Sequence, residues 1–311
     1  MLWLELLVVI AALVLGARVG GMFLGIAGGL GLAFLVFAFG LIPSSPPIDV
    51  MLIITAVIVA ASVLQVAGGM DFLVHCAERI LRSNPKHITF LAPIVCYFFT
   101  FMAGTGNIAF ALLPVIAEVA RETGIRPERP MSISVVASQQ AITASPVSAA
   151  MAALVALLSP LGVGMATIML VCVPATLLGC FLGALTVWKH GVELSEDSVY
   201  LRRLAEGTIK ASHSNSNAVF IPKPKAKLSV AIFVLGAVLI VLFGTIPELR
   251  QMSMADGKIV SLSMTHVIEI IMLVVAGVIA ILCKPNIDDV AKSSVFQAGM
   301  TGVICIFGLA W

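Results

Sequence analysis

The residues of this chain with the clearest chemical potential lie in two polar interruptions of long apolar stretches. The first interruption is Gly104-Thr105-Gly106-Asn107, and the second is Thr143-Ala144-Ser145-Pro146-Val147-Ser148. Hydrocarbon offers no water to an open backbone amide or carbonyl, so a break persists only where protein or a water-lined cavity surrounds it. Broken helices near the bilayer centre form the binding sites of many secondary transporters. The two breaks therefore indicate a transporter.

The second break lies near the centre of the apolar stretch 131–158, which is longer than one membrane span needs. Ser followed by Pro is a helix-start signal, with Ser145 as the N-cap and Pro146 at the first helical position. We therefore expect a broken helix whose first half ends near Ile142 and whose second half begins at Pro146. The free amides of the second half would carry the positive end of its dipole. Three hydroxyl groups lie beside these amides, those of Thr143, Ser145 and Ser148.

The first break offers the same chemistry. Gly104 and Gly106 permit a tight turn, Thr105 supplies a hydroxyl, and Asn107 can cap a return helix that starts at Ile108. Two helix starts with hydroxyls and an amide, but without a buried Lys or Arg, suit a small anion such as a carboxylate. The carbonyls released at the breaks could instead coordinate a cation, and both modes stay open.

A Ser-Pro pair within a span is often only a kink that a neighbouring helix satisfies. We favour a binding site because the two breaks fall in adjacent elements that are expected to meet at one depth. Gln139, about one turn before the second break, either lines this site or packs against protein. The candidate substrate-binding residues are Gly104, Thr105, Gly106, Asn107, Gln139, Thr143, Ser145, Pro146 and Ser148.

Composition assigns the chain to the membrane proteins. Hydrophobic residues make up 60% and charged residues 11% of its 311 residues, and the mean hydropathy is +1.12. An ordinary soluble domain is about 45–50% apolar and about 25% charged. We therefore predict an all-α, polytopic membrane protein. Besides the opening run 1–16, the expected spans are 21–42, 50–67, 163–187, 228–246 and 263–282.

The chain shows no motif of several other functional classes. Its six cysteines have no CxxC pair or other metal-ligand spacing, so we expect packing residues and no metal site. No Walker-type phosphate loop is present, and the basic residues lie in loops rather than in a stripe that would bind nucleic acid. A GxSxG, HExxH or paired-Asp constellation is also absent. We therefore predict no enzyme, no catalytic residues and no cofactor.

The distribution of the 18 Lys and Arg residues selects one topology. If the N-terminus lies outside and segment 88–120 enters and leaves on the same side, 16 basic residues are cytoplasmic and only Arg250 and Lys258 lie outside. A single crossing by 88–120 would leave 6 inside and 12 outside, against the positive-inside rule. The arms, 88–103 and 108–120, are shorter than the about 20 residues of a full span. We therefore expect a re-entrant hairpin that enters from the cytoplasm.

Two further segments complete the expected organisation. Segment 71–83 is amphipathic at helical period and is expected to lie along the membrane interface. The long polar stretch 188–227 begins with a short surface helix and continues with a composition typical of a flexible linker. We predict an N-terminal membrane half over 1–187 with hairpin 88–120 and broken helix 131–158, a cytoplasmic linker over 188–227, and the start of a second membrane repeat over 228–311.

The two breaks and several other stretches resemble the anaerobic four-carbon-dicarboxylate transporter (Dcu) family. The resemblance covers the whole chain and is most specific at the two breaks. The stretches that carry it are Gly16-Ala17-Arg18-x-Gly20-Gly21, Leu64-Gln65-Val66-Ala67-Gly68-Gly69-Met70-Asp71, Arg82-x-Asn84-Pro85-Lys86, Ala103-Gly104-Thr105-Gly106-Asn107, Leu113-Pro114-Val115-Ile116-Ala117-Glu118-Val119-Ala120, Arg126-Pro127-x-Arg129-Pro130, Ala144-Ser145-Pro146-Val147-Ser148-Ala149, Phe296-x-Ala298-Gly299-Met300 and Gly308-x-Ala310-Trp311.

The resemblance implies a bacterial inner-membrane exchanger that takes up fumarate, malate or aspartate and releases succinate under anaerobic conditions. It also implies a fold similar to the wider ion-transporter superfamily, with two inverted repeats that each contain a hairpin and a broken helix. On this basis residues 104–107 and 143–148 form the first repeat's half of the site. The implied partners are small dicarboxylates and the lipid bilayer, and self-association stays open.

Members of the family continue beyond Trp311 with a second hairpin and a second broken helix. The resemblance therefore implies that this chain is a C-terminally truncated fragment with an incomplete second repeat and half of the site. One alternative function is a transport-inactive partner that only associates with other membrane proteins. Another is a transporter of a different small organic anion.

Overall fold

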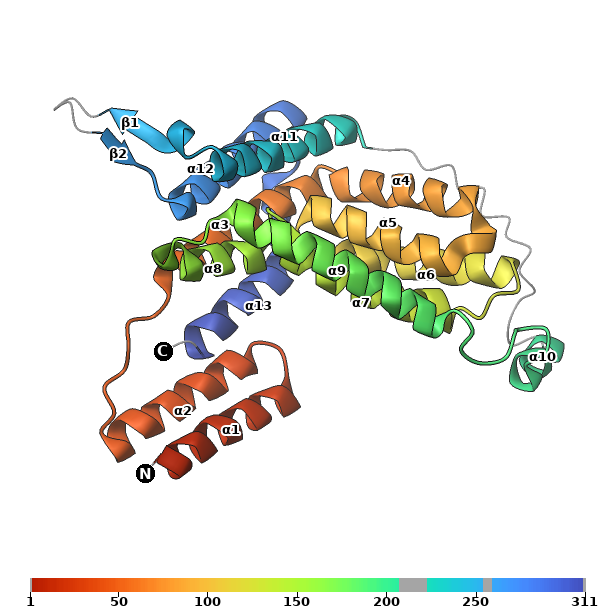
Figure 1. The fold of residues 1–311 in the computed structure, drawn as a ribbon, viewed down its shortest axis with the longest axis horizontal. Coiled ribbons are helices and arrows are strands. Elements are labelled where there is room, and N and C mark those ends of the chain that lie inside the picture. Colours follow the sequence, from red (N-terminus) through yellow and green to blue (C-terminus); the bar gives the residue numbers. More distant parts are fainter. Residues whose placement is uncertain (1, 207–222, 254–258, 310–311) are drawn as a thin grey trace.

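Helices make up almost all of the computed structural model, which describes residues 2–206, 223–253 and 259–309 (Figure 1). The helices of the first half are α1 Leu2–Val19, α2 Phe23–Phe39, α3 Ile48–Val66, α4 Gly69–Ser83, α5 Ile88–Ala103, α6 Asn107–Glu122, α7 Glu128–Ala144, α8 Ala149–Leu158 and α9 Met165–Val187. The later helices are α10 Ser198–Ala205, α11 Ala226–Thr245, α12 Met264–Cys283 and α13 Ser294–Leu309.

The remaining regular elements are short. Strands β1 Gln251–Ser253 and β2 Ile259–Ser261 pair antiparallel, with Gln251 opposite Ser261. The 3-10 helices of the described residues are Pro85–His87, Ser159–Leu161, Pro247–Arg250 and Ile287–Asp289. Lys258, Trp311 and segment 207–222 of the expected linker lie outside the described residues.

The prediction of an all-α polytopic membrane protein is confirmed. Seven helical segments within the described residues are long and apolar enough to cross a membrane, and the interrupted segment Glu128–Leu161 is the longest at 34 residues. The expected span 21–42 is shorter than predicted, because α2 ends at Phe39, where Gly40 adopts the left-handed conformation that often follows a helix.

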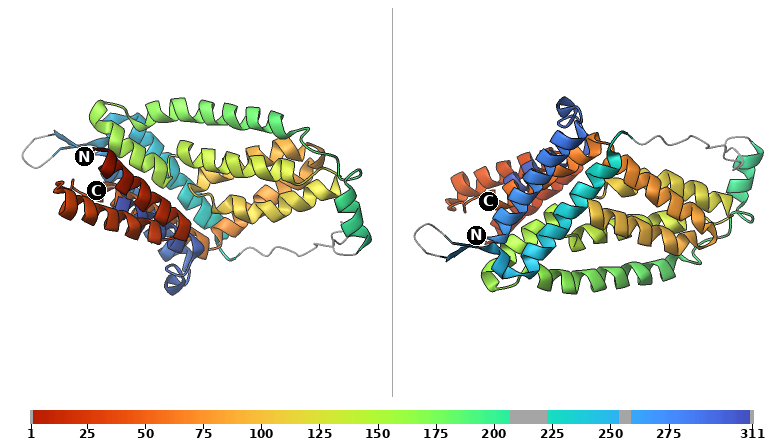
Figure 2. Two further views of the ribbon diagram at one scale, coloured as in Figure 1. Left: turned by 90° about the horizontal axis from the view of Figure 1, so that it is seen from below. Right: turned by 90° about the horizontal axis from the view of Figure 1, so that it is seen from above.

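The elements form two groups (Figures 1 and 2). In one group α4, α5, α6, α7 and α9 extend side by side along one half of the molecule, with α5 and α6 forming the expected helical hairpin. In the other group α3 packs against α12 and α13, while α1 and α2 form a separate antiparallel pair that reaches the body through α13. The two groups meet where α4 contacts α3 and α11, where α9 contacts α11, and where α7 leads into α8.

Helix α4 packs on the hairpin through its apolar side. Leu73, Ala77 and Leu81 are buried in one cluster with apolar residues of α5 and α6. Arg82 pairs with Glu78 of its own helix at 2.9 Å, as expected for an i,i+4 pair, and with Glu118 of α6 at 2.9 Å. The amphipathic segment is thus a helix whose apolar side covers the hairpin. Its position along the membrane interface stays a prediction.

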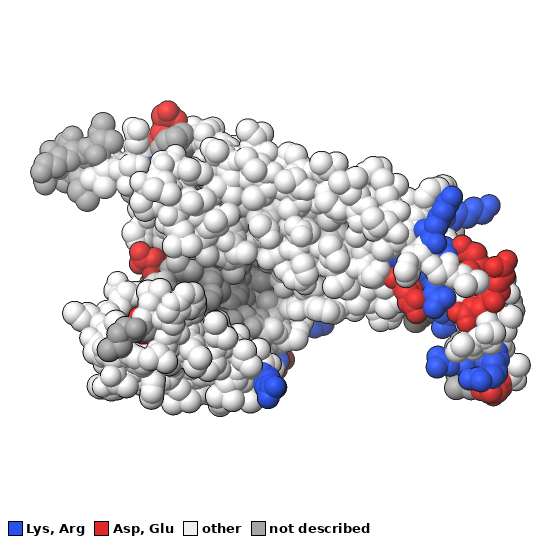
Figure 3. Space-filling model, turned by 60° about the horizontal axis from the view of Figure 1, so that its bottom comes forward, with Lys and Arg blue, Asp and Glu red and all other residues white. Residues whose placement is uncertain are grey.

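Charged side chains gather at one end of the molecule, near the α6–α7 turn and α10 (Figures 1 and 3). There the buried guanidinium of Arg129, 6% exposed, donates to the carbonyl oxygens of His190 at 2.7 Å and Gly191 at 2.8 Å. It also pairs with the Glu193 carboxylate at 2.7 Å. Because a buried cation is costly without partners, these contacts fix the chain after α9 to the start of α7.

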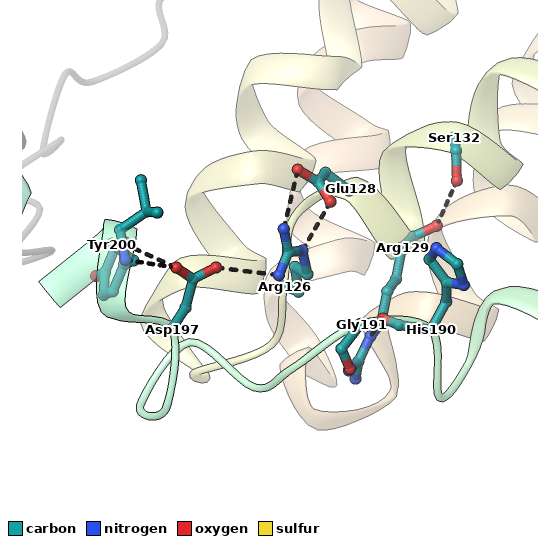
Figure 4. Close-up of polar contacts among 9 residues, drawn as sticks. Arg126, Glu128, Arg129, Ser132, His190, Gly191, Asp197 and Tyr200 are labelled. Carbon is teal, nitrogen blue, oxygen red and sulfur yellow. Dashed lines mark hydrogen bonds and ion pairs between the residues drawn. The ribbon is translucent and has the colours of Figure 1, made fainter.

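Arg126 attaches α10 to the same region at the start of α7 (Figure 4). Its guanidinium pairs with Glu128 at 2.7 Å and with Asp197 at 3.0 Å. Asp197 caps α10 by accepting the amides of Val199 and Tyr200. These amides and Arg126 hold the pKa of the Asp197 carboxyl below its ordinary value, so it is charged at neutral pH. The described part of the expected linker, 188–206, is therefore held against α7.

Helices α2 and α13 cross at unusually close backbone contacts. A Cβ atom added at Gly25 would clash with the Ile304 carbonyl oxygen, and one added at Gly28 would clash with that of Gly308. Small residues allow such approach where membrane helices pack. The glycine spacing of α2 thus serves helix packing.

Gly25→Ala should therefore separate α2 from α13 and destabilise the protein by about 1–3 kcal/mol, the usual range for overpacking. Gly29→Ala is the matched control in the same helix, since an added Cβ meets nothing within 4 Å there. It should be neutral or slightly stabilising, because Ala favours helix over Gly by about 0.5–1 kcal/mol. Thermal unfolding of the detergent-purified protein measures both, and equal melting temperatures would contradict the close contact.

Arg129→Gln should release segment 188–194 from α7, because the shorter neutral side chain cannot keep the hydrogen bonds to His190, Gly191 and Glu193. We expect amide hydrogen exchange in this segment to accelerate by about tenfold or more, as a lost charged hydrogen bond costs about 1.5–3 kcal/mol. Arg202→Gln, at an exposed ion pair of α10, is the control and should change little. Unchanged exchange in Arg129→Gln would show that the segment is held by other contacts.

Candidate functional site

The hairpin tip is a tight turn built on Gly104. Gly104 has φ +68°, in the left-handed region, and its amide donates to the Thr100 carbonyl at 2.8 Å. Helix α6 then begins at Asn107, with Gly106 at the N-cap position and without a side-chain cap. The prediction that Asn107 caps a helix starting at Ile108 is therefore wrong. The backbone amide of Asn107 instead donates to the Thr105 hydroxyl at 3.4 Å, so Thr105 supplies the acceptor at the start of α6.

The second break lies between α7 and α8, but its boundaries differ from the predicted ones. Helix α7 continues past Ile142 to Ala144, and α8 begins at Ala149 with Ser148, not Ser145, as its N-cap. The Ser148 hydroxyl accepts the Met151 amide at 3.0 Å. Proline disfavours the helical conformation of the residue before it. Ser145 is accordingly extended, and a turn closed by Ser148 N–H and the Ser145 carbonyl at 3.2 Å follows.

The two breaks meet in space through their backbones. The Ser145 hydroxyl donates to the Phe101 carbonyl of α5 at 2.6 Å. A Cβ atom added at Gly104 would lie 2.5 Å from the Val147 carbonyl oxygen, so only glycine fits between them. One turn away, the Thr100 and Ser138 hydroxyls hydrogen-bond at 2.9 Å. Protein atoms thus satisfy part of the backbone that is opened at the two breaks.

A cavity of about 290 Å³ opens beside this contact. All four residues of the hairpin tip line it, together with Ile142 and Ala149 from either side of the second break. Its opposite wall consists of α3 and α13 and includes small residues that leave room for a ligand. These wall residues are Ile54, Val57, Ile58 and Ala61 of α3, and Val295, Ala298, Gly299, Gly302 and Ile306 of α13.

The predicted site residues separate into two sets. Gly104, Thr105, Gly106 and Asn107 line the cavity. Gln139 lies beside the tip, since its Nε2 atom would be 3.2 Å from a Cβ added at Gly106.

The other predicted residues have structural surroundings. Ser145, Pro146 and Ser148 are buried, and the Ser148 hydroxyl lies within hydrogen-bond distance of the Ile142 and Ser145 carbonyls. Thr143 is exposed and does not line the cavity. The serine hydroxyls therefore hold the break in shape, while the hairpin tip faces the cavity.

Sequence reasoning missed the wall formed by α3 and α13. Gln65, at the end of α3, joins these helices by donating to the Ser294 hydroxyl at 2.8 Å and accepting the Val295 amide at 3.1 Å. The small residues Ala298, Gly299 and Gly302 were the available signal. They indicated close packing but not the partner, because α3 and α13 are distant in sequence.

Two helices begin at the cavity and could hold a small anion there, while α5 and α7 end with their carbonyls at the same two breaks. Helices α6 and α8 both begin at it, and neither has an acidic residue in its first turn. Their first amides carry the positive ends of two dipoles. No Lys or Arg is among the described residues that line the cavity, so an anion there would be held by backbone amides and by the Thr105 and Asn107 side chains. Such an arrangement can bind a carboxylate without a buried cation.

Ser145→Ala should destabilise the protein, since it leaves the Phe101 carbonyl without its hydroxyl partner at a buried position. The expected cost is about 1–3 kcal/mol. Thr143→Ala, two residues earlier and exposed, should stay within about 0.5 kcal/mol of the parent protein. Thermal or urea unfolding in detergent measures both. Equal stability of the two variants would mean that the hydroxyl does not join the break to the hairpin.

Known proteins resemble this chain along its entire length. The profile of the family described as anaerobic C4-dicarboxylate membrane transporter matches residues 1–311. The C4-dicarboxylate transporter DcuA of Wolinella succinogenes is 48% identical over 311 residues, which are 100% of this chain and 70% of that protein. DcuA of Escherichia coli strain K12 is 45% identical over 312 residues, with the same coverage.

A more distant relative has a different name within the same family. The anaerobic C4-dicarboxylate transporter DcuB of Escherichia coli O6:H1 is 36% identical over 316 residues, covering 99% of this chain and 70% of that protein. No solved structure matches the chain. The full-length profile match and the high identity to several members show that the chain belongs to the anaerobic C4-dicarboxylate membrane transporter family.

Proposed function

We propose that this protein exchanges four-carbon dicarboxylates across a bacterial inner membrane, taking up fumarate, malate or aspartate and releasing succinate under anaerobic conditions. One observation carries the proposal: the tip of a helical hairpin and the start of a broken half-helix converge on a cavity in a chain of this family. The family name supplies the class of substrate, and the two helix N-termini supply a physical reason for an anion.

In this proposal the hairpin tip is the binding element. The Asn107 side-chain amide and the first amides of α6 donate to one carboxylate, and the Thr105 hydroxyl completes the donor set. Gln139 lies close enough to the tip to reach the same ligand. The buried residues Ser145, Pro146 and Ser148 keep the start of α8 directed at the cavity. Thr143 lies at the edge of the binding site. Movement of the hairpin and broken helix against α3 and α13 would expose the cavity alternately to the two sides.

The orientation is also proposed. With the N-terminus outside and 188–227 in the cytoplasm, the cluster of Arg126 and Arg129 lies on the cytoplasmic side, which agrees with the positive-inside rule. The proposed organisation keeps the N-terminal membrane half over 1–187 and a second repeat that starts at 228. The inverted symmetry of the two halves belongs to this proposal.

Counterflow in proteoliposomes tests the proposal. Vesicles that contain the purified chain and internal succinate should accumulate labelled fumarate and aspartate, whereas vesicles without internal dicarboxylate should not. Absence of exchange by correctly folded protein would favour a transport-inactive partner of other membrane proteins. Exchange of monocarboxylates but not of dicarboxylates would favour a transporter of another small organic anion.

Asn107→Ala should weaken substrate binding about tenfold, because a hydrogen bond to a charged group contributes about 1.5–3 kcal/mol. Gln140→Ala is the control, since Gln140 is exposed and does not line the cavity. The concentration of fumarate at half-maximal exchange measures both effects, with the melting temperature as a check of folding. An unchanged value in Asn107→Ala would exclude the hairpin tip as the binding element.

A further inference from the structure

A second cavity, of about 210 Å³, is lined by the turn between α8 and α9. This turn lies at the end of the molecule opposite α10 (Figure 1). The turn contributes Ser159, Gly162 and Gly164. The first residues of α9 and α12, Met165 and Met264, line it together with Arg250. It is separate from the cavity at the hairpin tip, with which it shares no lining residue.

Arg250 is the unusual member of this cavity. Its Nε atom is buried and has no hydrogen-bond partner within the described part of the chain. No ion pair of the described residues includes Arg250. A buried donor of a charged group costs free energy unless a partner satisfies it. The Nε–H group of Arg250 therefore calls for an acceptor that the described residues do not supply.

The backbone around Arg250 is well fixed. Its carbonyl accepts the Leu262 amide at 2.8 Å, next to the paired strands β1 and β2. The backbone of Arg250, just before β1, is thus hydrogen-bonded to the residue just after β2. The side chain is presented to the cavity by a defined element rather than by a free loop.

The helix ends near the cavity carry partial charges of the same sign as Arg250. Helix α9 begins at Met165 without a side-chain cap and without an acidic residue in its first turn. Helix α12 begins at Met264, also without an acidic residue in its first turn. Both helices direct the positive ends of their dipoles toward this end of the molecule. No Asp or Glu is among the described residues that line the cavity.

We propose that this cavity is a second binding site, in which the Arg250 guanidinium and the first amides of α9 hold a carboxylate group of the dicarboxylate substrate. The planar fork of an Arg matches the two oxygens of a carboxylate. The identity of the ligand rests on the proposed function, whereas the site itself rests on the cavity and on the buried Nε–H group of Arg250, which has no acceptor among the described residues. In the proposed orientation Arg250 lies outside, so the site receives the substrate at the outer face before it reaches the hairpin tip.

Cysteine protection tests the site directly. Ser159 is exposed and lines the cavity, so the variant Ser159→Cys reports on its occupancy when it is labelled by a membrane-impermeant maleimide. The protein is reconstituted in phosphatidylcholine nanodiscs, and the labelling of the parent chain is subtracted. Succinate should slow the labelling of Ser159→Cys, and the uncharged dimethyl succinate should not.

Arg250→Gln, added to Ser159→Cys, should raise the succinate concentration needed for half protection about tenfold, and Arg250→Lys should raise it less. Arg79→Gln, at an exposed Arg of α4, is the control and should leave protection unchanged. Asn107→Ala should also leave it unchanged, because Asn107 lines the other cavity. Equal melting temperatures of the Arg250 variants show that folding is intact.

Four results would overturn this site. Protection that persists in Arg250→Gln would exclude the guanidinium as its centre. Protection by phosphatidylglycerol in the nanodisc, but not by succinate, would assign the cavity to a lipid phosphate. Absence of succinate protection while counterflow proceeds would remove this site and leave the proposed function intact, whereas absence of both protection and counterflow would remove the two together.

Discussion

The structure depends on how backbone groups opened at membrane depth are satisfied without water. The Ser145 hydroxyl reaches the Phe101 carbonyl at 2.6 Å, and Gly104 packs directly against the Val147 carbonyl. These contacts leave no room for lipid or for a side chain between the two breaks. They fix the N-terminal ends of α6 and α8 beside one cavity, where the first amides of these helices could meet an anion.

The sequence was sufficient to predict the breaks but not their full geometry. Gly104 and Pro146 are strong local signals, and the hairpin and broken helix are present in the all-α fold. The N-cap was assigned three residues too early because Ser145 and Ser148 are equally good capping residues. Pro146 makes Ser145 extended, but the turn that follows became evident only in the structure. The wall of α3 and α13 depends on contacts between residues far apart in the chain, which no local pattern of one sequence encodes.

Polar residues at the site perform two different tasks. Buried serines satisfy backbone carbonyls, so their hydroxyls are occupied by the fold itself. Thr105 and Asn107 face the cavity and remain able to meet a ligand. The same distinction applies to the arginines, because the Arg129 side chain is buried among three protein acceptors while the buried Nε atom of Arg250 has no partner in the described residues. The partners of a polar group, rather than its residue type, thus separate structural roles from binding roles.

An experimental structure in lipid with bound succinate tests the central claim most directly. Our account predicts that the hairpin tip contacts the α7–α8 break and that succinate lies in the cavity beside Gly104–Asn107, with a carboxylate at the start of α6. Succinate bound elsewhere, with the cavity at the tip empty, would contradict this account. An unbroken helix through residues 144–149, or a hairpin tip separated from the break by lipid, would contradict it equally.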